Sequence, residues 1–365
     1  MIVRRAWVAN AILLASAVIV TTVAIEFVFR RLPGERFILT RSTLCSPEYP
    51  AQRSDYLPFT TPRSATVHAK RAEFSVDYIF DHNGYRTSAQ PVPVPETADS
   101  IIFVGDSFTL GWGVDYDRTF PGILAREFGE KNIRVYNAGY KAGYSPDSYA
   151  AFLAAEGEAL RPRAVVTTIY SGNDFEDIAM NIWRTVDANG YPTSLDTTRV
   201  YPDFTGRMMR YRSLTPDYAC NSPLGRSYTF MGMMNLLDPR LRALRKKMAE
   251  AKPKNGQPLI SEDETYSRFV TSLRGIGAFC RQQEALCLFA VIDAPPKQRP
   301  WKYYRLALQS VRDAGFDPIE LGVVVPQKGY FPGDGHFNPV GHEAVARRLR
   351  GALDGAALGL NNETN

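Results

Sequence analysis

The sequence predicts an α/β protein built on a doubly wound parallel sheet. Three short apolar runs rich in β-branched residues lead into turns that contain Gly105, Gly139 and Gly172. Runs of this length, bounded by glycine turns and separated by helical patterns, are typical of buried strands. A strand–helix–strand–helix–strand order predicts parallel strands with helices on both faces. A ligand of such a sheet binds beyond the carboxyl ends of its strands.

The N-terminal segment predicts a membrane anchor in residues 1–31. From Ala6 to Ile25 there are twenty residues without a charge, and a helix of that length spans the roughly 30 Å apolar core of a bilayer. The signal-anchor helix is expected at about 6–29. A cleaved signal peptide is the alternative, because Thr22-Val23-Ala24 ends in small residues. Arginines flank both ends of the run, so the positive-inside rule leaves its orientation open.

Residues 32–97 are expected to form a stalk and an accessory β element. The stretch is rich in Pro, Ser, Thr and Arg and has no sustained helical period. Within it, Glu73–Phe80 alternates imperfectly between apolar and polar residues, and Asn83-Gly84 is a typical hairpin turn. The pattern predicts a β-hairpin packed beside the main sheet. His68 and His82 are expected at the surface, because neither belongs to a cluster with metal-ligand spacing.

The strand Ser100–Val104 ends at Gly105-Asp106-Ser107. A hydroxyl placed where a buried strand stops, beside a glycine that permits a tight turn, is a common way to present a nucleophile. The same three residues are also ordinary turn composition. The choice between these two interpretations depends on residues far downstream.

Those downstream residues lie between Gly333 and His342, where Asp334 stands two positions before His336. A serine hydroxyl needs a base with a pKa near 7 and a third group that orients the base. Ser107, His336 and Asp334 can supply all three roles. His342 is the rival imidazole, since it lies six residues further on, within the helix that follows.

A reaction at an acyl carbon also needs donors for the developing oxyanion. The N–H of Ser107, the N–H of Gly139 and the side-chain amide of Asn173 follow three neighbouring strands and are predicted to converge there. Asp174 either supports the asparagine or caps a helix. A metal bound by Asp334, His336 and His342 is disfavoured, and no metal site is predicted.

The remaining elements follow from hydrophobic periodicity and from helix and turn signals. Helices are expected at 123–128, 145–160, 264–282, 301–314 and 339–353, and strands at 133–136, 164–170, 285–292 and 323–326. The stretch 178–262 is an insertion that carries eight aromatic residues and a basic helical segment. It is interpreted as a packing module, with a lid or sugar-binding platform as the alternative.

Composition excludes some classes of function. The chain has 365 residues, 45% of them hydrophobic, and a net charge of +5. Four arginines flank the N-terminal apolar run, so this charge does not predict nucleic-acid binding. The four cysteines allow disulfides Cys280–Cys287 and Cys45–Cys220, with four buried thiols as the alternative. The sequence has no CxxC pair, which argues against structural zinc.

Four blocks of this chain resemble the SGNH (GDSL-like) hydrolase family. They are GDSFTLG with Ser107, NAG with Gly139, SGND with Asn173, and DGH with His336 and Asp334. Two positions depart from the family pattern: Ser171 replaces a glycine in the third block, and Asp-x-His replaces Asp-x-x-His. The shorter spacing resembles the branch that acts on envelope polysaccharides. The G-x-S-x-G elbow of α/β-hydrolases is absent, since Thr109 occupies its last position.

The resemblance implies a flavodoxin-like sheet in a hydrolase domain at 98–355, followed by a tail at 356–365. It implies a serine esterase without a cofactor, acting on ester-linked acyl groups of a small molecule or of an envelope or exported polysaccharide. A polysaccharide O-acyltransferase and a non-catalytic scaffold are the alternatives. The expected location is the bacterial inner membrane, with the N-terminal helix as the membrane contact and the catalytic domain on the periplasmic side.

Overall fold

The computed structural model describes residues 2–31, 54–70, 73–179, 183–186, 192–195, 260–293 and 301–355, with residue 295 and short stretches between 223 and 240. The chain divides into two compact units, which are described separately. The first contains residues 1–47, 70–72 and 205–255, and the second contains 48–69, 73–204 and 256–365. The predicted tail at 356–365 and most of the insertion lie outside the described residues.

The first unit contains helix α1 (Ile2–Arg31). The carboxylate of Glu26 accepts hydrogen bonds from the Ser227 hydroxyl and from the N–H groups of Tyr228 and Thr229, at 2.8–3.1 Å. Among the described residues, no helix combines the length and the apolar character needed to cross a bilayer. Several side chains of the Ala6–Ile25 segment lie outside the description. The membrane anchor therefore stays a prediction.

The second unit is organised around an eight-stranded sheet in the order β1-β2-β3-β5-β4-β6-β9-β10. The strands are β1 (Ala65–Lys70), β2 (Ser75–Phe80), β3 (Arg86–Thr87), β4 (Ser100–Gly105), β5 (Arg134–Gly139), β6 (Pro162–Tyr170), β9 (Leu286–Ile292) and β10 (Pro318–Glu320). From β5 to β10 the neighbours are all parallel. This five-strand order is the flavodoxin-like one.

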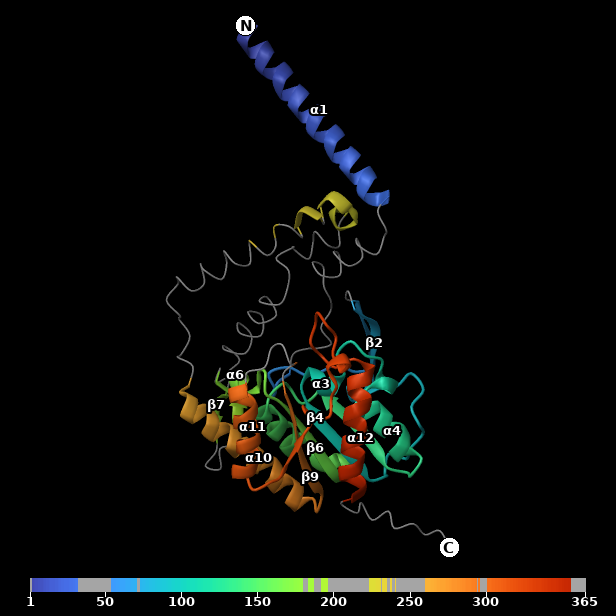
Figure 1. The fold of residues 1–365 in the computed structure, drawn as a ribbon, viewed down its shortest axis with the longest axis vertical. Helices are drawn as coiled ribbons and strands as arrows, with labels where there is room; N and C mark the ends of the chain where they lie inside the picture. Colours follow the sequence, from blue (N-terminus) through green and yellow to red (C-terminus); the bar gives the residue numbers. More distant parts are fainter. Residues whose placement is uncertain are drawn as a thin grey trace. The chain divides into compact units, whose positions relative to one another are not determined.

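Strand β4 shows why the sheet is covered on both faces. All six of its residues are buried, and successive side chains point to opposite sides. Ile101 and Phe103 pack into one hydrophobic cluster, and Ile102 and Val104 pack into another. Helices α4 (Phe120–Gly129) and α12 (Pro339–Gly355) line the first side. The second side is covered by α5 (Pro146–Phe152), α10 (Glu262–Gln282) and α11 (Trp301–Asp313). Figure 1 shows α10 and α11 on the side of the sheet opposite α4 and α12.

The predicted hairpin is present, but it extends the sheet rather than packing beside it. Strands β2 and β3 are antiparallel, and Arg86 of β3 pairs with Asn137 of β5. Gly84 in the connecting turn has a φ of +91°, a conformation that glycine adopts without strain. The sheet is consequently mixed, whereas the sequence predicted a parallel one.

The edge strand predicted at 323–326 is wrong. Ile319 of β10 pairs with Ala290 of β9 and is buried, whereas Val323 is 75% exposed. The edge strand is therefore formed by Pro318–Glu320, whose Ile319 is buried, and not by residues 323–326. Other short elements include α3 (Ser107–Leu110), α6 (Asp174–Ala179) and the antiparallel pair β7 (Trp183–Val186) and β8 (Pro192–Leu195).

The predicted Cys280–Cys287 disulfide is absent, because both residues are free thiols. A hydrogen bond with Cys280, together with burial, raises the pKa of Cys287. This environment disfavours the thiolate of Cys287, which is the reactive form of the side chain. Cys45 and Cys220 lie outside the described residues.

Candidate active site

Ser107 is the first residue of α3, directly beyond the carboxyl end of β4. A Cβ at Gly105 would overlap the hydroxyl groups of Thr109 and Thr168, so only glycine fits this turn. Asp106 caps α3 by accepting the Phe108 N–H at 2.9 Å. The strand end, the glycine and the cap together place the Ser107 hydroxyl at the edge of the sheet.

The structure brings Ser107, His336 and Asp334 into one hydrogen-bonded series. The Nε2 atom of His336 lies 2.7 Å from the Ser107 hydroxyl oxygen. On the other side of the ring, Nδ1 bonds to a carboxylate oxygen of Asp334. Because an ionised carboxylate only accepts, Nδ1 carries the proton and Nε2 is free to accept the hydroxyl proton.

Gly335 allows Asp334 to hydrogen-bond His336 across the short Asp-x-His spacing. This residue has a φ of +85°, in the left-handed region. Its N–H donates to the Phe331 carbonyl at 2.9 Å, and the Phe331 N–H donates to the His336 carbonyl at 2.8 Å. The resulting tight turn lets Asp334 reach the ring of a residue only two positions away.

Asp334 is held in its charged form. Burial raises the pKa of its carboxyl. The hydrogen bond and the charge of His336, together with a hydrogen bond from the Trp112 side chain, lower this pKa by more than burial raises it. The net result is a pKa below the ordinary aspartate value. A charged Asp334 can both orient the imidazole and stabilise its protonated form.

Two of the predicted oxyanion donors are still able to donate. The Ser107 N–H stands at the start of α3, where helix N–H groups have no intrahelical acceptor. One N–H of the Asn173 amide donates to Asp177 Oδ2 at 2.8 Å, and the amide has a second one. Both groups follow adjacent parallel strands, β4 and β6.

The Gly139 N–H, the third predicted donor, already has an acceptor. It donates to the side-chain oxygen of Asn137 at 2.9 Å. The amide group of Asn137 in turn donates to the Thr109 carbonyl at 2.9 Å, which ties β5 to α3. In this structure, Gly139 is placed beside the nucleophile turn, and its N–H is directed at a neighbouring side chain.

Two buried carboxyls lie behind these groups. Burial raises the pKa of Asp106 to about 6, against the opposing effects of the Phe108 N–H and of His336. Burial also raises the pKa of Asp174 well above its ordinary value, with Asp106 and Asp177 adding to the effect. Asp174 neither bonds to Asn173 nor acts as a simple helix cap: its Oδ2 accepts the Tyr170 N–H at 3.0 Å and closes the turn after β6.

His342 does not compete for Ser107. Its side chain is buried, and its Nδ1 accepts the Phe120 N–H at 3.3 Å. Burial lowers the pKa of His342 to about 3, with the charges of Arg86 and His336 adding to the effect, so the ring is neutral. It packs between the rings of Phe120 and Phe337. His336 is therefore the imidazole that contacts the serine.

Sequence reasoning missed three residues from or near the hairpin. Trp112, two residues after α3, hydrogen-bonds Asp334 and lies 6.2 Å from the His336 ring. The fully buried guanidinium of Arg86 donates to the carbonyls of Leu110, Gly111 and Val114. Glu73 accepts hydrogen bonds from the loop that carries Asp334. Only Trp112 had a usable signal, since it stands between two glycines just after the nucleophile.

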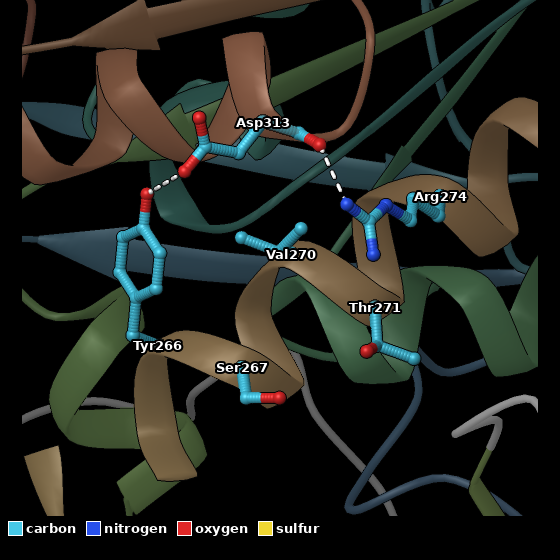
Figure 2. A pocket seen from close by; sticks show the side chains of 6 residues that line it. All are labelled: Tyr266, Ser267, Val270, Thr271, Arg274 and Asp313. Carbon is cyan, nitrogen blue, oxygen red and sulfur yellow. Dashed lines mark hydrogen bonds between the residues drawn. The ribbon is translucent and has the colours of Figure 1, made fainter. Parts of the chain in front are cut away.

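A separate surface pocket lies between α10 and the end of α11 (Figure 2). Tyr266 donates to the Asp313 carboxylate at 2.7 Å, and Arg274 donates to the Asp313 carbonyl at 2.8 Å. None of the candidate catalytic residues lines this pocket.

Within the described part of the chain, no three His, Cys, Asp or Glu side chains are grouped as metal ligands would be.

Comparison with known proteins gives matches to solved structures only. No family model matches the chain, and no curated protein matches it. The structure of TesA has a TM-score of 0.38 and 14% identity, covering 70% of this chain and 98% of TesA. An acetyl xylan esterase, AlAXEase, has a TM-score of 0.37 and 12% identity over 70% of this chain and 99% of its own. The esterase EstA from Pseudoalteromonas sp. has a TM-score of 0.37 and 10% identity over 70% and 97%.

Proposed function

We propose that this protein is a serine esterase of the SGNH type. The observation that carries the proposal is the continuous hydrogen-bonded series from Ser107 through His336 to Asp334. A serine, an imidazole and a carboxylate hydrogen-bonded in this order are the elements of an activated nucleophile. The series forms at the carboxyl edge of a parallel sheet, where substrates bind in such folds.

In the proposed reaction, Ser107 attacks the carbonyl carbon of an ester. His336 takes the hydroxyl proton at Nε2 and returns it to the leaving alcohol, while Asp334 holds the imidazolium. The oxyanion is bound by the Ser107 N–H and the Asn173 amide, and by the Gly139 N–H if Asn137 releases it. Water, deprotonated by His336, then attacks the acyl-enzyme carbonyl. The bond between the acyl carbon and the Ser107 oxygen breaks, His336 returns the proton to that oxygen, and the carboxylic acid leaves.

The proposed substrate is an O-acyl group on an envelope or exported polysaccharide. The support is the Asp-x-His spacing, which resembles the polysaccharide-acting branch of the family. If a sugar hydroxyl replaces water in the second step, the same site performs acyl transfer. Product partition between water and an added glycan acceptor distinguishes the two: release of free acid alone supports hydrolysis, and an acylated glycan supports transfer.

The primary test is labelling with a fluorophosphonate, which reacts with an activated serine. We expect wild type to be labelled and Ser107→Ala and His336→Asn to be unlabelled. Ser75→Ala is the matched control, because Ser75 is exposed on β2. Wild type that resists labelling under conditions where the protein is folded would favour the non-catalytic scaffold.

We further propose that residues 1–31 anchor the chain in the bacterial inner membrane, with the hydrolase domain in the periplasm. The support is the run of twenty uncharged residues from Ala6 to Ile25. The full chain should stay in the membrane fraction through alkaline carbonate extraction. Protease added to spheroplasts should then digest the domain. Recovery in the soluble fraction at full length would contradict the anchor.

A further inference from the structure

The accessory hairpin hydrogen-bonds the loop that carries Asp334 and His336 through Glu73. Glu73, just before β2, accepts the Gly333 N–H at 3.0 and 3.1 Å with its two carboxylate oxygens. It also accepts the Asp334 N–H at 2.9 Å. One carboxylate thus accepts from two backbone donors that lie 260 and 261 positions away in the sequence.

The residue after Glu73 closes the same contact with apolar surface. The Phe74 ring lies 5.6 Å from the Phe331 ring and packs edge-on against Trp112 at 5.9 Å. Trp112 itself hydrogen-bonds the Asp334 carboxylate. Glu73 therefore acts on the backbone of this loop, and its neighbour packs against the indole that contacts the Asp334 side chain.

The other end of the hairpin hydrogen-bonds the segment that follows α3, the helix that begins with Ser107. Arg86 of β3 donates to the carbonyls of Gly111 and Val114 at 2.8 and 2.6 Å. The hydroxyl of Tyr78 on β2 accepts the Gly113 N–H at 2.8 Å. One hairpin thus contacts both segments that must meet for Ser107 and His336 to react.

We propose that Glu73 is a positioning residue, which holds the 333–336 loop so that Asp334 and His336 face Ser107. Charged hydrogen bonds to backbone N–H groups are stronger and more directional than neutral ones. Without them, the turn at Gly335 is free to shift, and a displacement of about 1 Å in a catalytic group can cost on the order of a hundredfold in rate. This inference rests on the proposed esterase activity.

The test compares the full-length wild type with Glu73→Ala, Glu73→Gln and Asp77→Ala. Asp77 is the matched control, because it is an exposed carboxylate on the same hairpin. Among the described residues, its carboxylate bonds only to His68. We expect Glu73→Ala to slow fluorophosphonate labelling of Ser107 and ester turnover by about tenfold to a hundredfold, with KM unchanged. Glu73→Gln retains an acceptor oxygen and should fall between Glu73→Ala and wild type. Asp77→Ala should match wild type.

A second readout separates positioning from general stability. The downfield proton resonance of the His336–Asp334 hydrogen bond should broaden or disappear in Glu73→Ala and persist in Asp77→Ala, at equal thermal stability. Wild-type labelling rate and an intact resonance in Glu73→Ala would overturn the inference while leaving the esterase proposal standing. Absence of labelling in wild type would instead remove the esterase proposal itself. If Glu73→Ala does not fold, Glu73→Gln decides by the same two measurements.

Discussion

Gly105 of β4 and Gly139 of β5 lie directly opposite each other in the sheet. Their pairing places the nucleophile turn and the NAG block at the same sheet edge. Both positions exclude a side chain, because a Cβ would overlap Thr109 and Thr168 at Gly105 and the backbone of Leu110 at Gly139. Gly139 therefore sets how closely α3 approaches β5, and Gly105 sets how closely the hydroxyls of Thr109 and Thr168 approach β4.

Substitution of Gly139 by alanine should destabilise the fold and the site together. The added methyl group overlaps backbone atoms, which cannot move aside as a flexible side chain can. We expect a loss of about 1–3 kcal/mol in the free energy of unfolding, measured by urea denaturation. Gly351→Ala on α12 is the control, because nothing lies within 4 Å of its added Cβ. That variant should be neutral or more stable by up to about 1 kcal/mol, and equal losses at both positions would contradict the packing argument.

Removal of the Asn173 amide tests its part in the oxyanion site. Asn173→Ala should lower kcat by about a hundredfold to a thousandfold with little change in KM, because the lost donor acts in the transition state. Steady-state kinetics on a chromogenic ester measure both quantities. An unchanged kcat would exclude Asn173 from the oxyanion site.

Asp334→Asn should retain the fold and lose most of the activity. The amide would hydrogen-bond the imidazole but could not stabilise its positive charge, and it favours the wrong tautomer. We expect kcat to fall on the order of a thousandfold or more, with fluorophosphonate labelling slowed in parallel. Near-normal turnover would show that the base acts without this carboxylate.

Asp106 makes stability depend on pH in a defined direction. Burial raises its pKa from 3.8 to about 6, so between these values the folded chain keeps a proton that the unfolded chain has released. The free energy of unfolding therefore falls as pH rises through this range and stays lowered above it. Asp106→Asn keeps an acceptor for the Phe108 N–H and removes the buried charge. Its melting temperature should exceed that of wild type near neutral pH, and the difference should vanish below about pH 4. A difference that is independent of pH would contradict this assignment.

The buried guanidinium of Arg86 should be essential for the stability of the segment at the end of α3, whose carbonyls it binds. Arg86→Met leaves three carbonyls without a donor in the interior, at a cost of about 1–3 kcal/mol for each unsatisfied group. Arg86→Lys keeps a donor but lacks the planar fork, so it should recover only part of the loss. Thermal unfolding ranks the three proteins, and equal stability of Arg86→Met and wild type would exclude this role.

Local sequence signals predicted the elements that place Ser107, Asn173 and His336, because each follows a glycine turn at the end of an apolar run or opens a helix. Such signals could not predict Glu73 or Arg86 as partners of the site, since their contacts span 260 and 24 or more positions and depend on how the hairpin pairs. The Gly139 N–H was assigned as a donor from its place in a motif, whereas its acceptor depends on the rotamer of Asn137. The edge strand was misplaced because Ile319 and Val323 are equally apolar, and only the register against β9 separates them.

The pairing of Arg86 with Asn137 has a consequence for where this chain can be truncated. A fragment that starts at residue 98, just before β4, would expose the lateral edge of β5, which pairs with β3 in the full chain. It would also lack Glu73 and Arg86, which hydrogen-bond the 333–334 loop and the segment after α3. A truncation meant to yield a minimal folded unit must therefore begin upstream of β1, before Ala65.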